Sequence, residues 1–222
     1  KYENIVLMLF DGMGVSAIKK HLKPTDFLMQ HFVDTISSVC PSTTACAIPT
    51  VESGKAPIEH SWLGWDMYFK NENKIVTVFK NTLKDSCEVA EDYNVINKYA
   101  PYIRIDEQIK ENNKDMNVNV LFPFGNQKYD SISDMINQII SITKNKTKNF
   151  IYAYAEEPDG TMHDTGTNSD ETRNVIKNFN REIERLSNEV EDAVILVTAD
   201  HGHINSNKIN LNDYPDFKST LK

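Results

Sequence analysis

Cysteine is scarce in this chain of 222 residues, which holds only three. Cys40, Cys46 and Cys87 form an odd and widely spaced set, so neither a disulfide framework nor a CxxC metal site is predicted. Buried or semi-buried free thiols are expected instead, and they fit a cytoplasmic protein. The chain starts at Lys1 and shows no signal peptide.

Long apolar runs and an excess of positive charge are also missing. No stretch of about 18 uncharged apolar residues occurs, so no membrane span is predicted. Acidic residues number 32 against 24 basic ones, which gives a net charge of −8. This balance excludes a general nucleic-acid binder with a basic face, and no nucleic-acid polymer is expected as a partner. A small phosphate-containing substrate stays compatible, because bound metal ions reverse the local field.

Five short apolar runs, bounded by polar or turn residues, are present. They have the length of strands buried on both faces, as in parallel sheets covered by helices, and comprise residues 5–10, 75–79, 118–122, 150–155 and 193–198. Two segments with helical periodicity, 131–146 and 169–190, begin at the N-cap candidates Ser131 and Ser169. This order predicts an α/β fold with a mostly parallel central sheet flanked by helices.

The stretch from about 62 to 130 is less regular, and we interpret it as partly a cap-like insertion over one end of the sheet. The whole chain, 1–222, is then a single α/β catalytic domain. An aromatic run at 62–69 contains Trp62 and Trp65, which we expect to line a substrate pocket. The alternative is that this run forms a small core beneath the insertion.

Three acidic residues, Asp11, Asp159 and Asp200, follow predicted strands. The carboxyl ends of parallel strands meet at one edge of the sheet, where ligands bind. His163 and His201 accompany two of these carboxylates. Taken alone, an aspartate after a strand is more often a helix N-cap. Together the set predicts a site for zinc or another divalent ion.

A cluster of hydroxyl groups lies between the first two of these motifs. Ser42, Thr43 and Thr44 precede a short predicted helix that Gly54 closes. A hydroxyl at a helix N-terminus lies near the positive end of the dipole and near free N–H groups, which also bind phosphate. The alternative is that these residues only cap the helix. Pro49 predicts a late start or a kink.

These motifs resemble the alkaline phosphatase superfamily, and within it the type I phosphodiesterase/nucleotide pyrophosphatase family in its bacterial single-domain form. The resemblance spans most of the chain, because five motifs occur in the family's order. They are Leu9-Phe-Asp11-Gly-Met-Gly14, Pro41-Ser-Thr-Thr44, Ser53-Gly54 with Glu59-His60 beyond it, Glu157-Pro-Asp159-Gly-Thr-Met-His163 and Thr198-Ala-Asp200-His201-Gly202.

The resemblance implies two divalent metal ions, usually zinc, with manganese or another ion as an alternative. The ligands of the nucleophile-side ion would be Asp11, Thr44, Asp200 and His201. Asp159 and His163 would match two ligands of the other ion. Two ions held close together stabilise the attacking and leaving oxygens of an in-line displacement.

The resemblance also implies the activity. Thr44 matches the family nucleophile, because it stands three residues after Pro41; Thr43 is the less favoured neighbour. The implied function is a metal-dependent phosphoesterase that hydrolyses phosphodiester or nucleotide pyrophosphate bonds of a small substrate. The reaction would pass through a covalent phospho-threonine intermediate.

The chain departs from the family in two respects. Ala47 stands three residues after Thr44, where nucleotide pyrophosphatases commonly have an asparagine that helps to hold the phosphoryl oxygen. The other departure concerns the second metal site. The family completes the second metal site with a histidine near its C-terminus, in a His-Gly or His-Ala-Gly context, and nothing after His203 matches. We therefore expect a C-terminally truncated domain whose missing ligand lies beyond Lys222. His203 is a weaker candidate, because it lies two residues from His201, whereas a helical spacing of three or four would direct a ligand more easily.

Several other functions are compatible with the motifs. A phosphonoacetate hydrolase and a phosphomonoesterase of the same superfamily stay open, as does a non-catalytic metal- or nucleotide-binding domain. A sulfatase is excluded because no Cys-x-Pro-x-Arg motif occurs, and a phosphoglycerate mutase because it needs a much larger second domain. The scarcity of arginine favours diesters over monoesters. The arginines are Arg104, Arg173, Arg181 and Arg185.

Overall fold

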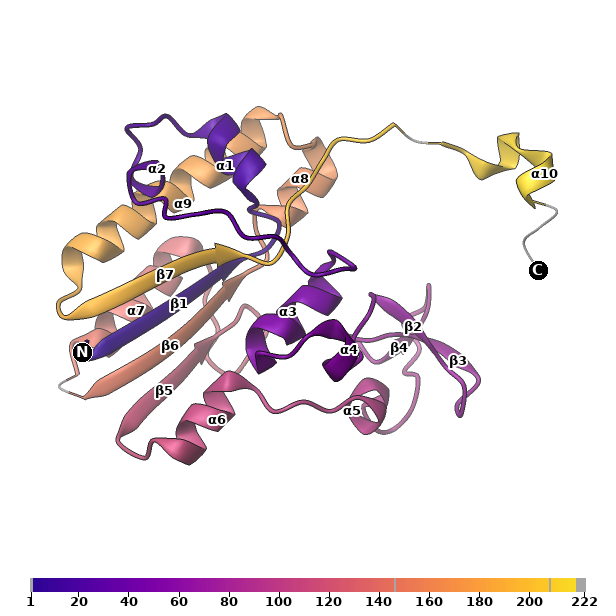
Figure 1. Ribbon diagram of the computed structural model, residues 1–222, viewed down its shortest axis with the longest axis horizontal. Coiled ribbons are helices and arrows are strands. Elements are labelled where there is room, and N and C mark those ends of the chain that lie inside the picture. The colour runs from indigo at the N-terminus through magenta and orange to yellow at the C-terminus, as the bar shows by residue number, and fades with distance from the viewer. Residues whose placement is uncertain (1, 146, 208, 219–222) are drawn as a thin grey trace.

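A four-stranded parallel sheet forms the centre of the computed structural model, which describes residues 2–145, 147–207 and 209–218. The strand order is β5-β6-β1-β7 (Figure 1). Four of the five predicted runs are confirmed as strands of this sheet. They are β1 Asn4–Phe10, β5 Met116–Leu121, β6 Lys148–Ala155 and β7 Ala193–Ala199.

Helices cover both faces of the sheet (Figure 1). One face carries α1 Val15–His21, α2 Phe27–Gln30, α7 Ile132–Thr143, α8 Asp159–Thr165 and α9 Asp170–Glu189. The other face carries α3 Thr44–Ser53 and α6 Ile105–Asn112. Side chains alternate along each strand, so Ile151 and Ala153 of β6 pack with α7 and α9 while Tyr152 and Tyr154 face α3. The predicted α/β class is confirmed.

The two long helices begin where their capping residues predict. Ser131 Oγ accepts the N–H of Asp134 at 3.1 Å, and Ser169 Oγ accepts the N–H of Thr172 at 3.0 Å. Each bond satisfies one of the N–H groups that a helix start leaves unpaired. Lys146, at the end of the first predicted helical segment, lies outside the described residues.

The predicted strand at 75–79 is placed differently. Residues of this run form β3 Lys74–Thr77, which pairs antiparallel with β2 Asp66–Phe69 and β4 Thr82–Leu83 in a separate small sheet. Val76 and Thr77 are buried but Ile75 is exposed, so the strand is covered at its end and not along its whole length. A short apolar run fits either environment, and its position within the irregular stretch decides between them.

This small sheet belongs to a region that we call the cap, residues 62–100. It includes α5 Val95–Tyr99, lies next to α4 Pro57–His60, and has an apolar core of its own. The cap lies beside α3 at one end of the central sheet (Figure 1).

The last described elements are η1 Leu211–Asp213 and α10 Pro215–Lys218, which lie apart from the sheet and its helices (Figure 1). None of the helices in the described ranges combines the length and the apolar character that a membrane crossing requires.

The cysteines are free thiols, but only Cys46 is buried; Cys40 and Cys87 are exposed, contrary to the sequence prediction.

Candidate functional site

The register of the central sheet brings the first two aspartates together. Phe10, the last residue of β1, is paired with Ala199 of β7, so the residues that follow them, Asp11 and Asp200, lie side by side. Asp159 reaches the same place from β6 by a short loop, and its N–H donates to the Asp11 carbonyl oxygen at 3.1 Å. The predicted convergence of three carboxylates at one sheet edge is therefore present in the structure.

Thr44 reaches this edge from the first turn of α3. Thr43 occupies the N-cap position without a side-chain capping bond, and Thr44 is the first helical residue, so its hydroxyl is not used for capping. The helix runs through Pro49 and ends at Gly54, whose left-handed φ of 69° lets its N–H reach the Thr50 carbonyl oxygen.

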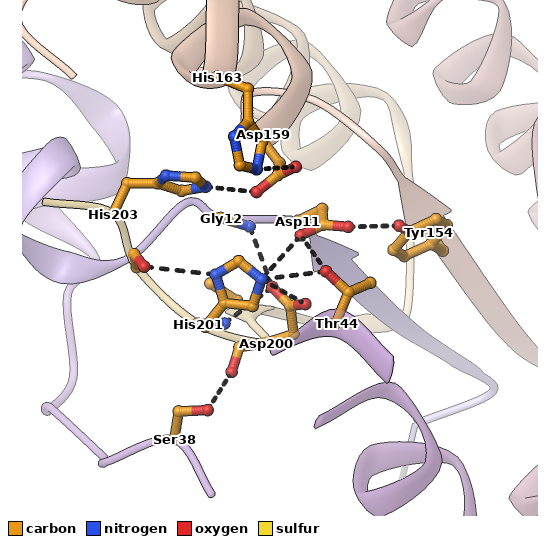
Figure 2. Close-up of polar contacts among 12 residues, drawn as sticks. Asp11, Gly12, Ser38, Thr44, Tyr154, Asp159, His163, Asp200, His201 and His203 are labelled. Atoms are coloured by element: carbon orange, nitrogen blue, oxygen red, sulfur yellow. Dashed lines mark hydrogen bonds and ion pairs between the residues drawn. The ribbon is translucent and has the colours of Figure 1, made fainter. Parts of the chain in front are cut away.

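The imidazole of His201 lies at the centre of a group that we call the first cluster: Asp11, Thr44, Asp200 and His201. His201 Nε2 lies 3.0 Å from Thr44 Oγ1, 3.3 Å from Asp11 Oδ1 and 3.4 Å from Asp200 Oδ2 (Figure 2). Thr44 Oγ1 also lies 3.3 Å from Asp11 Oδ1. Carboxylate, imidazole and hydroxyl ligand atoms thus converge on one point.

The electrostatics of the first cluster favour a bound cation. Asp200 Oδ1 accepts the N–H groups of Gly12 and His201, whereas its Oδ2 is buried and has no hydrogen bond. Burial, and then the charge of Asp200, raise the pKa of Asp11 well above its ordinary value. Among the described residues, the two buried carboxylates form ion pairs with no Lys or Arg, only with the His201 imidazole, and a divalent ion would supply the positive charge. The residues present fit a metal ion.

A second group, which we call the second cluster, lies next to the first and contains Asp159, His163 and His203 (Figure 2). Asp159 and His163 lie one turn apart on α8, with His163 Nε2 3.5 Å from Asp159 Oδ2. His203 Nε2 contacts Asp159 Oδ1 from the segment after β7. Two imidazoles and one carboxylate are a donor set of catalytic zinc sites.

Sequence reasoning missed one polar residue of the site, Tyr154. Its hydroxyl donates to Asp11 Oδ2 at 2.6 Å, which leaves Asp11 Oδ1 to face Thr44 and His201. Burial and the neighbouring Asp11 raise the pKa of Tyr154, so the hydroxyl stays protonated. The position of Tyr154 near the carboxyl end of a predicted buried strand could have indicated that its hydroxyl lies at the site.

A cleft of about 1320 Å³ extends from Asp11, Thr44 and Asp159 to the cap. Trp65 lines this cleft, is 44% exposed and meets Phe79 edge-on at 5.6 Å. Trp62 also borders the cleft, but it is 5% exposed, and its Nε1 donates to the Ala100 carbonyl oxygen. The two tryptophans of the aromatic run are thus placed differently.

The fold and these clusters define a class: an α/β protein whose sheet edge carries two adjoining groups of candidate metal ligands around a hydroxyl side chain. The chain belongs to the type I phosphodiesterase/nucleotide pyrophosphatase family, whose sequence profile matches residues 5–222. No curated protein sequence matches the chain.

Solved structures of animal proteins share this fold. Murine ectonucleotide pyrophosphatase/phosphodiesterase 5 is similar with a TM-score of 0.72 at 20% identity, over 95% of this chain and 61% of that one. An inactive threonine-to-alanine variant of the murine protein, in complex with AMP, gives 0.71 at 20% identity and the same coverage. The human protein gives 0.65 at 17%, over 90% and 57%. This chain thus spans about three fifths of their length.

Proposed function

We propose that this chain is a metal-dependent phosphoesterase that cleaves phosphodiester or nucleotide pyrophosphate bonds with Thr44 as the nucleophile. One observation carries the proposal. Thr44 Oγ1 lies 3.0 Å from His201 Nε2 and 3.3 Å from Asp11 Oδ1, where the cleft meets the sheet edge. The hydrolase family and the AMP complex of a structural relative support nucleotide esters as the first substrates to test.

The chemistry requires an activated Thr44, because a free hydroxyl stays protonated at neutral pH. When bound, two divalent ions, with zinc the first candidate and manganese an alternative, would lower the pKa of this hydroxyl and offset phosphoryl charge. In our proposal Thr44 Oγ1 forms a bond to phosphorus while the bond to the leaving oxygen breaks. Water then cleaves the phospho-threonine and restores the hydroxyl.

The start of α3 would help to hold the phosphoryl group. The helix has no side-chain cap, so its first N–H groups are free of side-chain partners. Such groups bind phosphate oxygens, and the helix dipole adds to the attraction.

Because Arg104 is already paired, the cationic side chains left among the described residues along the cleft for the second negative charge of a monoester are Lys80 and Lys110. Arg104 is the arginine that lines the cleft, and it is engaged with Glu52 at 3.0 Å and with Asp106 at 2.8 Å. A monoester would gain from an additional free positive group for its second negative charge. Arg104 is not free to supply it.

The test is to assay the purified protein, with and without a chelator, on four substrates: bis-p-nitrophenyl phosphate, a nucleotide p-nitrophenyl ester, p-nitrophenyl phosphate and phosphonoacetate. We expect chelator-sensitive cleavage of the first two. Mass spectrometry of the protein quenched during turnover should locate a phosphoryl adduct on Thr44. Preference for either of the last two substrates would indicate the phosphomonoesterase or the phosphonoacetate hydrolase instead.

Thr44→Ala should lower kcat by about 10⁴-fold or more, since removal of a nucleophile has effects of this size. Thr43→Ala is the matched control: Thr43 is the neighbouring hydroxyl, and it makes no side-chain capping bond. This control should retain most of the activity. Full activity of Thr44→Ala, or an adduct on Thr43 or Ser42, would contradict the proposal. Metal binding without turnover of any substrate would support a binding domain.

A further inference from the structure

We propose that His203 is the third side-chain ligand of the metal ion held by Asp159 and His163. The inference rests on the proposed function, because it concerns the second metal ion of that site. It replaces the expectation that this ligand comes from beyond Lys222.

The geometry of the second cluster carries the proposal. His203 Nε2 and His163 Nε2 approach opposite oxygens of the Asp159 carboxylate, Oδ1 and Oδ2 (Figure 2). The two imidazole rings lie 4.8 Å apart and are nearly perpendicular, at 89°. One ligand atom from each of the three residues lies within 4.8 Å of the others. A single ion can therefore be reached by all three side chains.

The backbone around the cluster makes room for His203. A Cβ on Gly12 would lie 3.0 Å from His203 Cδ2, so a side chain at residue 12 would press on the imidazole. A Cβ on Gly14 would lie 2.6 Å from the Cα of Gly202, so the two backbones approach too closely for any other residue. The glycines of the turn after β1 thus allow the segment after β7 to lie close to the site.

The spacing of two residues between His201 and His203 suits this segment. Residues 201–207 are not helical, and in an extended chain side chains at i and i+2 lie on the same side. The two rings lie 5.6 Å apart, with His201 directed to the first cluster and His203 to the second (Figure 2). An extended segment with a spacing of two residues therefore brings the two imidazoles to neighbouring clusters without a helix.

Burial also distinguishes the two imidazoles of the second cluster. The His203 side chain is 16% exposed, close to the 17% of Asp159, whereas that of His163 is 69% exposed. His203 is thus the more enclosed of the two. A role limited to orienting Asp159 by a hydrogen bond is the alternative, and it predicts a different response of metal binding to substitution.

The experiment measures binding of Zn²⁺ alone to chelator-treated protein, by titration calorimetry and by elemental analysis after dialysis. Wild type should bind two ions per chain. His203→Gln replaces the imidazole by an amide. The amide N–H can still donate a hydrogen bond to Asp159. The variant should bind one Zn²⁺ with the wild-type Kd. The Kd of its other Zn²⁺ should be higher than that of wild type by more than about 100-fold. That loss exceeds the roughly 10–100-fold effect of removing a group that only orients a ligand.

Three further measurements complete the design. His163→Ala should reproduce the His203→Gln pattern. His31→Ala is the matched control, because His31 is exposed and its ring packs on Phe27, and it should bind both ions normally. Circular dichroism and Tm in chelator should show that each variant is folded. The visible spectrum of Co²⁺-loaded protein should lose the contribution of one site in His203→Gln.

Two ions bound to His203→Gln with wild-type affinities would overturn the inference and limit His203 to a hydrogen bond. A wild-type chain that binds no Zn²⁺ would overturn this inference and the proposed function together. If wild type binds two ions and His203→Gln only one, the inference stands even where no phosphate ester is cleaved. In that case the proposed function alone fails.

Discussion

The first cluster and the core of the cap both border the cleft and are both buried, yet they are built in opposite ways. In the cap, Trp62 Nε1 donates to Ala100, and the Thr77 hydroxyl donates to Asp66 at 2.6 Å. The buried Oε2 of Glu72 has no hydrogen bond, but the Oε1 of this carboxylate is paired with Lys98. In the first cluster, Asp11 and Asp200 lie together, and one carboxylate oxygen has no hydrogen bond.

This difference distinguishes buried polar groups that stabilise the fold from buried polar groups that are suited to bind a ligand. Buried charges are costly unless they are paired, so a fold retains such an arrangement where a ligand completes it. In the cap the carboxylate of Glu72 already has a cationic partner, Lys98. In chelator, neutralising a carboxylate of the first cluster should therefore raise stability, whereas a substitution in the cap core should lower it.

Among the substitutions that test this contrast, Asp200→Asn should give the largest effect. In chelator the variant should be more stable than wild type by about 1 kcal/mol, or roughly 2–4 °C in Tm, because it removes the repulsion between two buried carboxylates. With Zn²⁺ wild type should gain more stability than the variant, which keeps only the second cluster intact. Phosphodiesterase activity should fall by more than about 1,000-fold, since ion-dependent charge stabilisation is worth several kcal/mol. Thermal melts and kinetic assays measure both effects.

The control for this substitution is Asp106→Asn. Asp106 is also buried, but it accepts a hydrogen bond from Arg104 at 2.8 Å. Its neutralisation should therefore lower stability in chelator, by about 1 kcal/mol. If both substitutions shift Tm in the same direction, the contrast between an unpaired and a paired buried carboxylate is wrong.

The sequence was sufficient to predict the strand-end part of the site. Asp11 and Asp200 directly follow uninterrupted apolar runs, so parallel pairing in register leaves little freedom in where they lie. Thr44 was predicted from its position before a short helix and from its motif.

The rest depended on contacts between distant segments, which local patterns do not encode. Tyr154 has the pattern of an ordinary core residue, and its hydroxyl gains a role only because β6 lies beside β1. His203 depends on the approach of Gly14 to Gly202. The strand at 75–79 was predicted, but its partner sheet was not, because hydrophobic periodicity does not identify partners.

The two tryptophans of the cap also differ in this way, because one is part of the core and the other faces the cleft. Trp62→Ala should lower the free energy of unfolding by about 3 kcal/mol, because it removes a buried side chain that packs on Phe79 and Tyr102. Trp65→Ala should change stability little, because the side chain is half exposed. It should instead raise KM for a nucleotide ester by about 5-fold or more, as expected for loss of a stacking surface.

Urea denaturation and steady-state kinetics measure these two effects. Trp62→Phe is the control, since it keeps an aromatic ring but loses the hydrogen bond to Ala100, and it should cost less than Trp62→Ala. An unchanged KM together with lowered stability in Trp65→Ala would mean that the whole aromatic run is core.

His60 and His201 show the same contrast between two buried imidazoles. His201 Nε2 faces three oxygens of the first cluster, whereas both nitrogens of His60 have partners. Thr50 Oγ1 donates to the Cys46 carbonyl oxygen, so His60 Nε2 must donate to Thr50 at 2.9 Å. His60 Nδ1 then accepts the N–H of Trp62 at 3.0 Å. The neutral ring is fully satisfied, so a structural role is expected.

Acid should therefore weaken the cap through His60, which gives the smallest predicted effect. Burial, with a further contribution from Lys55, lowers the pKa of His60, while Glu59 opposes the shift. A pKa lower in the folded state gives stability that is complete above the unfolded value of about 6.5 and is lost as the pH falls below it. A proton on Nδ1 would face the Trp62 N–H and break that bond, at a cost of about 1 kcal/mol, or roughly 2–4 °C in Tm.

His60→Gln cannot titrate, so the difference in Tm between wild type and this variant should shrink as the pH falls from 7.5 to 5. Melting in chelator keeps metal release out of the measurement, and His31→Gln corrects for an exposed histidine. Parallel Tm curves would show that the pKa of His60 is the same in the folded and unfolded states and would contradict the prediction. A shrinking difference would show that the bonds of His60 to Thr50 and Trp62 stabilise the fold while its ring is neutral, with no ion bound.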